Sequence, residues 1–178
     1  DDAGFQFAHN KIRQALYAEM PPSLRRECHL MIAETFEQVA AGQEQRYVYD
    51  LARHYVQGGE HVKGYRYSVL AAQRAERAYA LSEALAFYDQ ALGLLGETDA
   101  PVGMPTGRER DEQQLELRHR YAQLLLTTGQ IEASQESLAL CLDLSRGLGV
   151  QTAEADVLLD LGVSKGRLGS WSEAPVLA

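Results

Sequence analysis

The chain has 178 residues and a formal net charge of −8, and 46% of its residues are apolar. This length suits one domain or two small ones, and the apolar content is enough to bury a core, which excludes a disordered chain. No apolar run approaches the roughly 18 residues of a membrane-spanning helix, and no signal peptide is visible. We therefore expect a cytoplasmic protein that does not contact a membrane.

The negative charge belongs to one half of the chain. Residues 1–78 hold ten Lys/Arg and ten Asp/Glu, whereas residues 79–178 hold seven and fifteen. An acidic surface repels phosphate backbones, so nucleic-acid binding by this half is not expected. The acidic half is either a solvated surface that favours solubility or an acidic recognition patch.

Helix-forming residues dominate the sequence, which predicts an all-α class. The segment 5–7 alternates and could end a short strand. Apolar residues then recur at helical spacing in successive segments separated by Pro or Gly. The predicted helices are 10–20, 22–42, 48–58, 62–75, 81–95, 108–128, 131–146 and 152–168, and Trp171 opens a ninth.

The signals between these segments define the organisation of the chain. Pro21 and Pro22 end the first helix, and Pro22 suits the first turn of the second. Residues 96–107, dense in Gly and Pro, form the one clear loop, which we expect to be mobile. The predicted division is a connector at 1–45, helical repeats at 46–95, the loop at 96–107 and further repeats at 108–178, the last one truncated.

Small residues recur twelve positions apart in three places, with the frames offset by 50 and 40 residues. The pairs are Ala72/Ala84, Ala122/Ser134 and Gly162/Ala174. Small residues at these positions let two helices approach closely, while larger neighbours fill the space beside them. This spacing resembles tetratricopeptide repeats, although their usual period is about 34 residues. The resemblance implies an α-α superhelix, a solenoid of antiparallel helix pairs.

The first half resembles a second family. The pattern Phe-x-Phe-x-His-x-x-Ile-Arg-x-Ala-x-Tyr over residues 5–17 is similar to the end of the winged-helix domain in bacterial signal-transduction ATPases with numerous domains. Residues 51–55 (Leu-Ala-Arg-His-Tyr) and Gly58-Gly59 follow in the order seen between ATPase and repeats in such proteins. The resemblance implies that the chain is a fragment of a larger regulatory ATPase.

One residue is a candidate nucleotide contact through this resemblance. Ala8-His9-Asn10 lies where the family has a Met-His-Asp motif, whose histidine contacts the phosphate of bound ADP. The resemblance implies that role for His9 in the full-length protein, although Asn10 replaces the aspartate. The alternative is a capping or packing histidine, and no cofactor is expected in this fragment alone.

Catalytic and metal-binding patterns are absent from the sequence. There is no Walker-type loop, because Gly103–Arg108 lacks the lysine and a preceding strand, and no His-Glu-x-x-His occurs. Cys28 and Cys141 stand far apart at apolar helical positions, which predicts buried thiols. Isolated histidines on helices are mostly structural or solvated. We therefore expect neither an enzyme nor a metal site.

Stacked helix pairs form a curved surface whose concave face is lined by the first helix of each pair. The family resemblance places candidate partner-binding positions on three such helices. These are Arg66, Gln73 and Arg77, then Glu116, His119, Arg120 and Gln123, and finally Asp156 and Asp160. The lysine and asparagine of a carboxylate clamp are absent, so recognition of a free peptide C-terminus is not expected. The groove is either specific or merely solvated.

The sequence thus favours a non-catalytic module of a signalling or transcription-regulatory ATPase that binds a protein, a peptide or a small effector; self-association is compatible with it. A DNA-binding regulator with a winged helix at 1–45 is one alternative, and a plain structural scaffold is another. The balanced charge of the first half and the lack of a basic recognition helix count against DNA binding.

Overall fold

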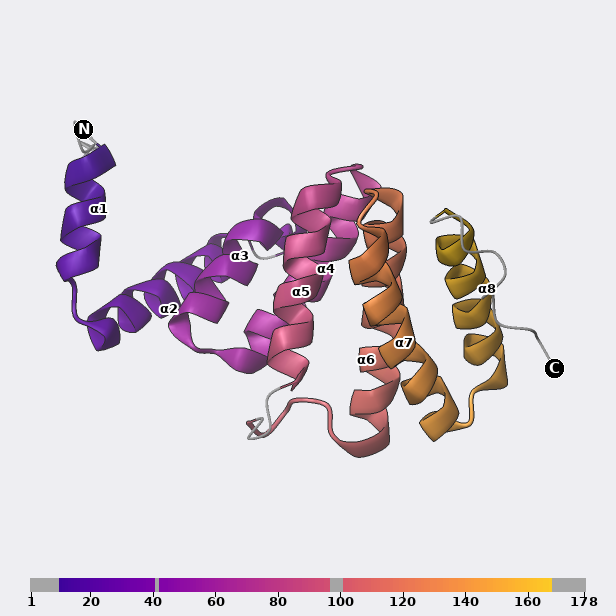
Figure 1. Cartoon of the computed structure of the whole chain (residues 1–178). Helices are drawn as coiled ribbons and strands as arrows, with labels where there is room; N and C mark the ends of the chain where they lie inside the picture. Colours follow the sequence, from indigo (N-terminus) through magenta and orange to yellow (C-terminus); the bar gives the residue numbers. More distant parts are fainter. Residues whose placement is uncertain (1–9, 41, 97–100, 168–178) are drawn as a thin grey trace.

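The computed structural model describes residues 10–40, 42–96 and 101–167, and within these ranges the protein is all-helical with no strand (Figure 1). This confirms the predicted all-α class. The strand expected at 5–7 and the ninth helix expected at Trp171 lie outside the described residues. The helices are α1 (Asn10–Glu19), α2 (Pro22–Val39), α3 (Glu44–Gly58), α4 (His61–Arg77), α5 (Leu81–Gly96), α6 (Gly107–Thr127), α7 (Ile131–Leu148) and α8 (Gln151–Arg167).

From α2 onward, each helix packs mainly against its neighbours in sequence, and the result is an elongated array with α1 and α8 at opposite ends (Figure 1). Buried side chains fall into three local clusters, one over α2–α4, one over α4–α6 and one over α6–α8. Local clusters that each involve only adjacent helices are the packing expected of a helical-repeat array. None of the described helices has the length and apolar character needed to cross a membrane.

The two central hairpins repeat each other in their packing. Ala72 of α4 and Ala84 of α5 have no exposed surface, and the same holds for Ala122 of α6 and Ser134 of α7. The Ser134 hydroxyl donates a hydrogen bond to the Ala122 carbonyl at 2.8 Å, so the two backbones lie close together. The third predicted pair cannot be compared, because Ala174 lies outside the described residues.

Four turns between helices share one backbone motif. Each has a residue with positive φ, and the N–H of the following residue bonds the carbonyl five positions back, as in a Schellman motif. The positive-φ residues are Gly59, Tyr79, Gly129 and Gly149, with φ of 77°, 57°, 81° and 70°. Three of these turns carry the expected glycine, and Tyr79 is an exception that the sequence did not predict.

Two details differ from the sequence-based expectations. The loop at 96–107 was expected to be mobile, but Met104 is buried against the core cluster of α4, α5 and α6, which fixes that part of it. Cys141 is buried as expected, and burial raises the pKa of its thiol to about 12. The prediction of a buried Cys28 is wrong, because its position on α2 is only half-buried. Pro22 does begin α2.

Tyr79 offers a test of the turn motif. An L-residue in the left-handed region costs about 1–2 kcal/mol, and the Tyr79 side chain is 87% exposed, so it contributes little packing. We expect Tyr79→Gly to raise the free energy of unfolding by about 1 kcal/mol. The neighbouring Ala78→Gly, at a φ of −87°, should lower it slightly. Urea denaturation of both variants measures this; a destabilised Tyr79→Gly would contradict it.

Candidate functional site

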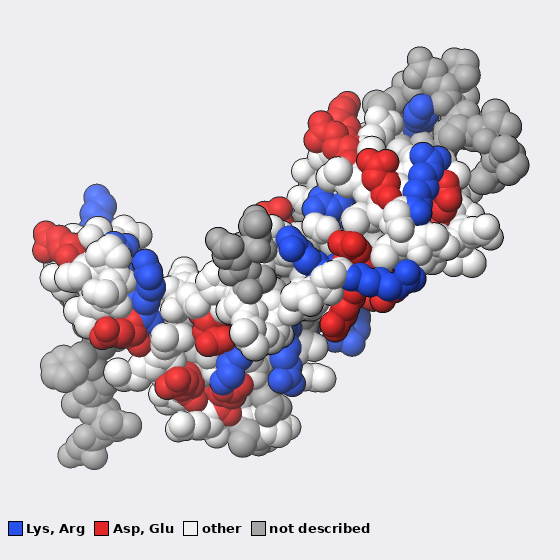
Figure 2. Space-filling view, turned by 90° about the horizontal axis from the view of Figure 1, so that it is seen from below, with Lys and Arg blue, Asp and Glu red and all other residues white. Residues whose placement is uncertain are grey.

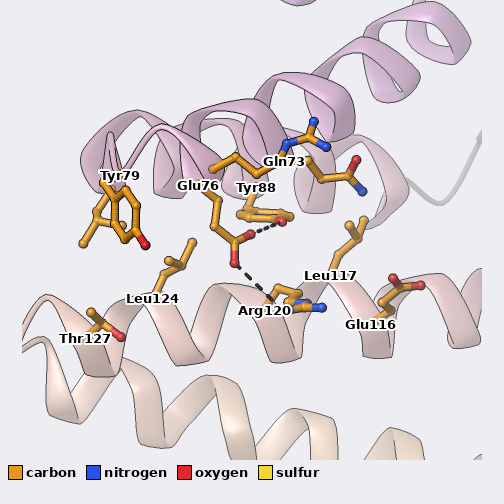
Figure 3. Close-up of a pocket in the computed structure, with 11 residues that line it drawn as sticks. Gln73, Glu76, Tyr79, Tyr88, Glu116, Leu117, Arg120, Leu124 and Thr127 are labelled. Atoms are coloured by element: carbon orange, nitrogen blue, oxygen red, sulfur yellow. Dashed lines mark hydrogen bonds and ion pairs between the residues drawn. The ribbon is translucent and has the colours of Figure 1, made fainter.

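A hollow of about 680 Å³ lies between the α4–α5 hairpin and α6 (Figure 3). Its floor contains the apolar side chains of Leu117 and Leu124, both from α6 and both buried. Polar residues stand around them, so the hollow combines an apolar floor with a polar rim. The rim residues are Gln73, Glu76, Arg77, Tyr79, Glu116, Arg120 and Thr127.

Glu76 ties the walls of this hollow together. Its carboxylate accepts a 2.8 Å hydrogen bond from the Tyr88 hydroxyl of α5, and its other oxygen lies 3.9 Å from a guanidinium nitrogen of Arg120 on α6 (Figure 3). Burial raises the pKa of Tyr88, and the hydrogen bond to Glu76 adds to this, so the hydroxyl remains a donor. One carboxylate thus connects α4, α5 and α6.

A second hollow, of about 410 Å³, continues the first along the same two helices. The two share Gln73, Glu116 and Leu117. The second adds Tyr65, whose hydroxyl donates a hydrogen bond to Gln113 across the gap between α4 and α6. Burial raises the pKa of Tyr65 to about 12, with Glu116 and Glu109 adding to the effect. We call these two connected hollows the α4/α6 groove.

Five of the predicted binding positions line the α4/α6 groove: Arg66, Gln73, Arg77, Glu116 and Arg120. They come from α4 and α6, the first helices of the two central hairpins. This is the arrangement that a concave solenoid face requires. These five predicted positions on α4 and α6 therefore lie on one continuous surface.

The remaining predicted positions lie apart from this groove. His119 Nε2 is 2.8 Å from Asp160 Oδ2, and Gln123 Nε2 donates to the same oxygen at 2.9 Å. These side chains therefore join α6 to α8, which makes them a contact between helices. Asp156 is exposed on α8, one turn before Asp160.

Several residues of the groove were not among the predicted positions, and three of them are instructive. Glu76 lies three residues after Gln73, so a stricter use of helical spacing would have placed it on the same face. The sequence assigned Tyr88 to the apolar face of its helix. The hydrogen bond of its hydroxyl depends on Glu76, which comes from another helix. Tyr79 gave no signal, because a turn between two predicted helices has no periodicity.

The surface charge shows how the acidic residues of the second half of the chain are distributed. On the face drawn in Figure 2, Lys/Arg and Asp/Glu side chains are interspersed along the array. Several of the acidic residues in that half form pairs, such as Glu112 with Arg108 at 2.7 Å and Glu154 with Arg146 at 2.7 Å. On this face the net negative charge is not gathered into one acidic recognition patch.

A histidine pair that the sequence did not predict lies where α1, α2 and α3 meet. The Nδ1 atoms of His29 and His54 are 2.7 Å apart, and the Tyr17 hydroxyl of α1 lies 2.7 Å from His29 Nε2. Both imidazoles are 8% exposed. Burial lowers the pKa of each, and the nearby Arg53 guanidinium lowers it further. In the described part of the chain, no group of three or more possible metal ligands occurs.

The histidine pair should make stability depend on pH. The folded-state pKa of each imidazole is lowered, so the unfolded chain binds more protons than the folded chain. The contribution of the histidine pair to the free energy of unfolding is therefore complete above about pH 6.5 and is lost as the pH falls below it. We expect urea unfolding to give a smaller free energy at about pH 5.5 than at about pH 7.5. In His29→Asn/His54→Asn the difference should shrink, and an unchanged difference would contradict the assignment.

Comparison with known proteins found no related protein. No family model matches the chain, and neither a curated protein nor a solved structure is similar to it. The resemblance to tetratricopeptide repeats and to regulatory ATPases therefore stays a prediction from the residues. His9, the predicted nucleotide contact, lies outside the described residues.

Proposed function

We propose that this chain is a non-catalytic interaction module that holds an extended protein or peptide segment in the α4/α6 groove. The observation that carries the proposal is the continuity of the two hollows through Gln73, Glu116 and Leu117. A row of connected hollows along two helices suits an extended chain. It suits a compact small molecule less well, because such a ligand is usually enclosed in a single cavity.

The chemistry of the groove supports the same proposal. Buried leucines form its floor and charged or amide side chains form its rim, which is the distribution found in protein interfaces. Three of the titratable groups at its walls are engaged with one another, Glu76 with Tyr88 and Arg120. Groups held in this way are suited to maintaining the shape of the groove, and this favours binding over proton transfer.

We further propose, from the motif order in residues 5–17 and 51–59 alone, that the module belongs to a cytoplasmic signalling ATPase. In such a protein, occupation of the groove would be relayed to a nucleotide switch. Hydrogen-bonded contacts between successive helices, such as that of Gln123 with Asp160, would couple one hairpin to the next.

The test is selection from an unbiased library of displayed random twelve-residue peptides, followed by affinity measurement with two protein variants. Gln73→Trp fills the junction of the two hollows without changing charge, whereas Gln135→Trp places the same ring on α7, at a position that is also half-buried. We expect recovered peptides to lose about tenfold or more in affinity for Gln73→Trp. Binding to Gln135→Trp should match the unaltered protein.

Two results would overturn the proposal. One is a selection that enriches no peptide, which would leave a plain scaffold of helical repeats. The other is a set of peptides that bind both variants equally, which would place binding on another surface. Circular dichroism of the two variants establishes that each retains its helical content, so that a loss of affinity reflects the groove.

A further inference from the structure

Four arginines gather on α3 and α4, next to the α4/α6 groove. Three of them, Arg66, Arg74 and Arg77, line a recess of about 300 Å³ together with Val48 and Leu70. A neighbouring recess is lined by Gln45, Arg46, Arg74, Arg77 and Ala78. We call Arg46, Arg66, Arg74 and Arg77 the arginine cluster.

No ion pair among the described residues involves the arginine cluster. The arginines that form ion pairs in this part of the chain are Arg53, Arg108, Arg120 and Arg146. Glu37 lines the same recess, but its carboxylate already accepts hydrogen bonds from Tyr55, Tyr67 and Lys63. Three arginines therefore share the recess with one carboxylate, and that carboxylate is already engaged by other donors.

Arg74 has a hydrogen-bond donor that lacks an acceptor. Its Nη1 atom is buried and has no hydrogen-bond partner within the described structure. Its guanidinium lies 5.3 Å from the centre of the Tyr49 ring, which holds the planar group in place. A buried guanidinium donor without an acceptor is costly, so a small rotation of the Arg74 side chain toward an anionic oxygen in the recess would be favourable.

Two other members are oriented in the same way. The guanidinium of Arg66 lies 5.9 Å from the Tyr67 ring, and that of Arg46 lies 5.8 Å from the Tyr47 ring. A guanidinium in contact with a ring face still has edge donors for the two oxygens of a carboxylate. The cluster therefore offers guanidinium donors to anionic oxygens, three of them beside aromatic rings.

The cluster is continuous with the α4/α6 groove. Arg77 lines both recesses and the larger hollow, and Tyr79 stands beside that hollow with its side chain almost fully exposed. At this position the other turns of the same motif have glycine, so the tyrosine is kept at a cost in backbone strain. Tyrosine and arginine are both enriched among the residues that contribute most to binding in interfaces.

We propose that the arginine cluster binds the carboxylates of an acidic peptide segment, and that Tyr79 packs against the same chain where it enters the α4/α6 groove. The inference rests on the proposed function and names the chemistry of its ligand. Val48 and Leu70 supply apolar contacts for intervening side chains in the recess. These apolar contacts favour a peptide with intervening apolar side chains over a phosphate polymer.

The experiment measures fluorescence anisotropy of a fluorescein-labelled twelve-residue peptide, three repeats of Glu-Ala-Asp-Leu, against its amide counterpart, three repeats of Gln-Ala-Asn-Leu. We expect the acidic peptide to bind about tenfold more tightly or better, with affinity falling between about 0.05 M and 0.5 M NaCl. Arg46→Gln/Arg77→Gln should lose about tenfold, and Arg74→Gln should weaken binding as well. The control Arg26→Gln/Arg108→Gln removes the same charge from exposed sites away from the cluster.

Equal binding of the acidic and amide peptides, or equal loss in both double variants, would overturn the proposal. Tighter binding of a labelled twelve-nucleotide oligothymidylate that is abolished by Arg46→Gln/Arg77→Gln would also overturn it and assign the cluster to single-stranded nucleic acid. If library peptides lose affinity for Gln73→Trp but are not enriched in Asp and Glu, the proposed function stands and only the proposal for the arginine cluster is refuted. If neither the library peptides nor the acidic peptide binds, both the proposed function and the proposal for the arginine cluster fail.

Discussion

Replacement of Glu37 by alanine is expected to lower the free energy of unfolding by about 3 kcal/mol. The Glu37 carboxylate accepts hydrogen bonds from Tyr55 at 2.6 Å, Tyr67 at 2.7 Å and Lys63 at 2.7 Å, and so connects α2, α3 and α4. Tyr55 and Tyr67 are 1% and 3% exposed, and their rings stack with centroids 5.6 Å apart. Without the carboxylate, both hydroxyls lose their acceptor in a partly buried setting, whereas the half-exposed Lys63 contributes less.

The matched control for this variant is Glu34→Ala, which removes an exposed glutamate from the same helix and should change stability by less than about 0.5 kcal/mol. Urea denaturation of both variants at neutral pH makes the comparison. Similar losses in the two variants would show that the network does not stabilise the array.

The same carboxylate predicts an acid-sensitive contribution. Burial alone would raise the pKa of Glu37, but the hydrogen bonds from Lys63, Tyr55 and Tyr67 outweigh it and lower the pKa to about 2. A lowered carboxylate pKa stabilises the fold above the unfolded-state value, and the contribution is lost as the pH falls from about 4.5 toward about 2. Glu37→Ala should therefore show a weaker dependence on pH over that range.

Replacement of Ala122 by leucine is expected to destabilise the protein by about 3 kcal/mol. Ala122 has no exposed surface, and its carbonyl receives the Ser134 hydroxyl across the α6–α7 contact. Three added carbon atoms would have to separate the two helices or force side chains out of their preferred rotamers, because interiors are close-packed. Loss of the Ser134 hydrogen bond would follow from the separation.

Ala133→Leu on α7 is the control, since Ala133 is exposed and should accept leucine within about 0.5 kcal/mol. Thermal and urea unfolding of the two variants measure the difference. A tolerated Ala122→Leu would mean that the recurrent small residues are not needed for the close approach of α6 and α7.

The sequence predicted the helices and two of the three small-residue pairs well, for a physical reason. Helical periodicity and turn glycines are local signals, so Gly59, Gly129 and Gly149 could be assigned to turns before any tertiary structure was known. Burial of Ala84 and Ser134 could likewise be inferred from spacing alone. The turn at Tyr79 was missed as a turn of the same motif, because a strained non-glycine residue carries no sequence signal.

The candidate site could be predicted only in part. Positions on one helix face, such as Gln73 and Arg77 or Glu116 and Arg120, follow from helical spacing. Whether such positions face a groove or a neighbouring helix depends on the partner element. His119 and Gln123 have the same spacing on the same helix, yet their side chains contact Asp160 on α8. The His29–His54 contact joins residues 25 positions apart on two helices, so no local pattern could have indicated it.

The most direct test of the central claim is to map where a recovered library peptide binds, by titrating it into isotope-labelled protein and following backbone amide shifts. The account predicts the largest changes at Gln73, Arg77, Glu116 and Arg120, on the two walls of the α4/α6 groove, with little change on α8. Shifts confined to α2 and α8, with the groove residues unmoved, would contradict it.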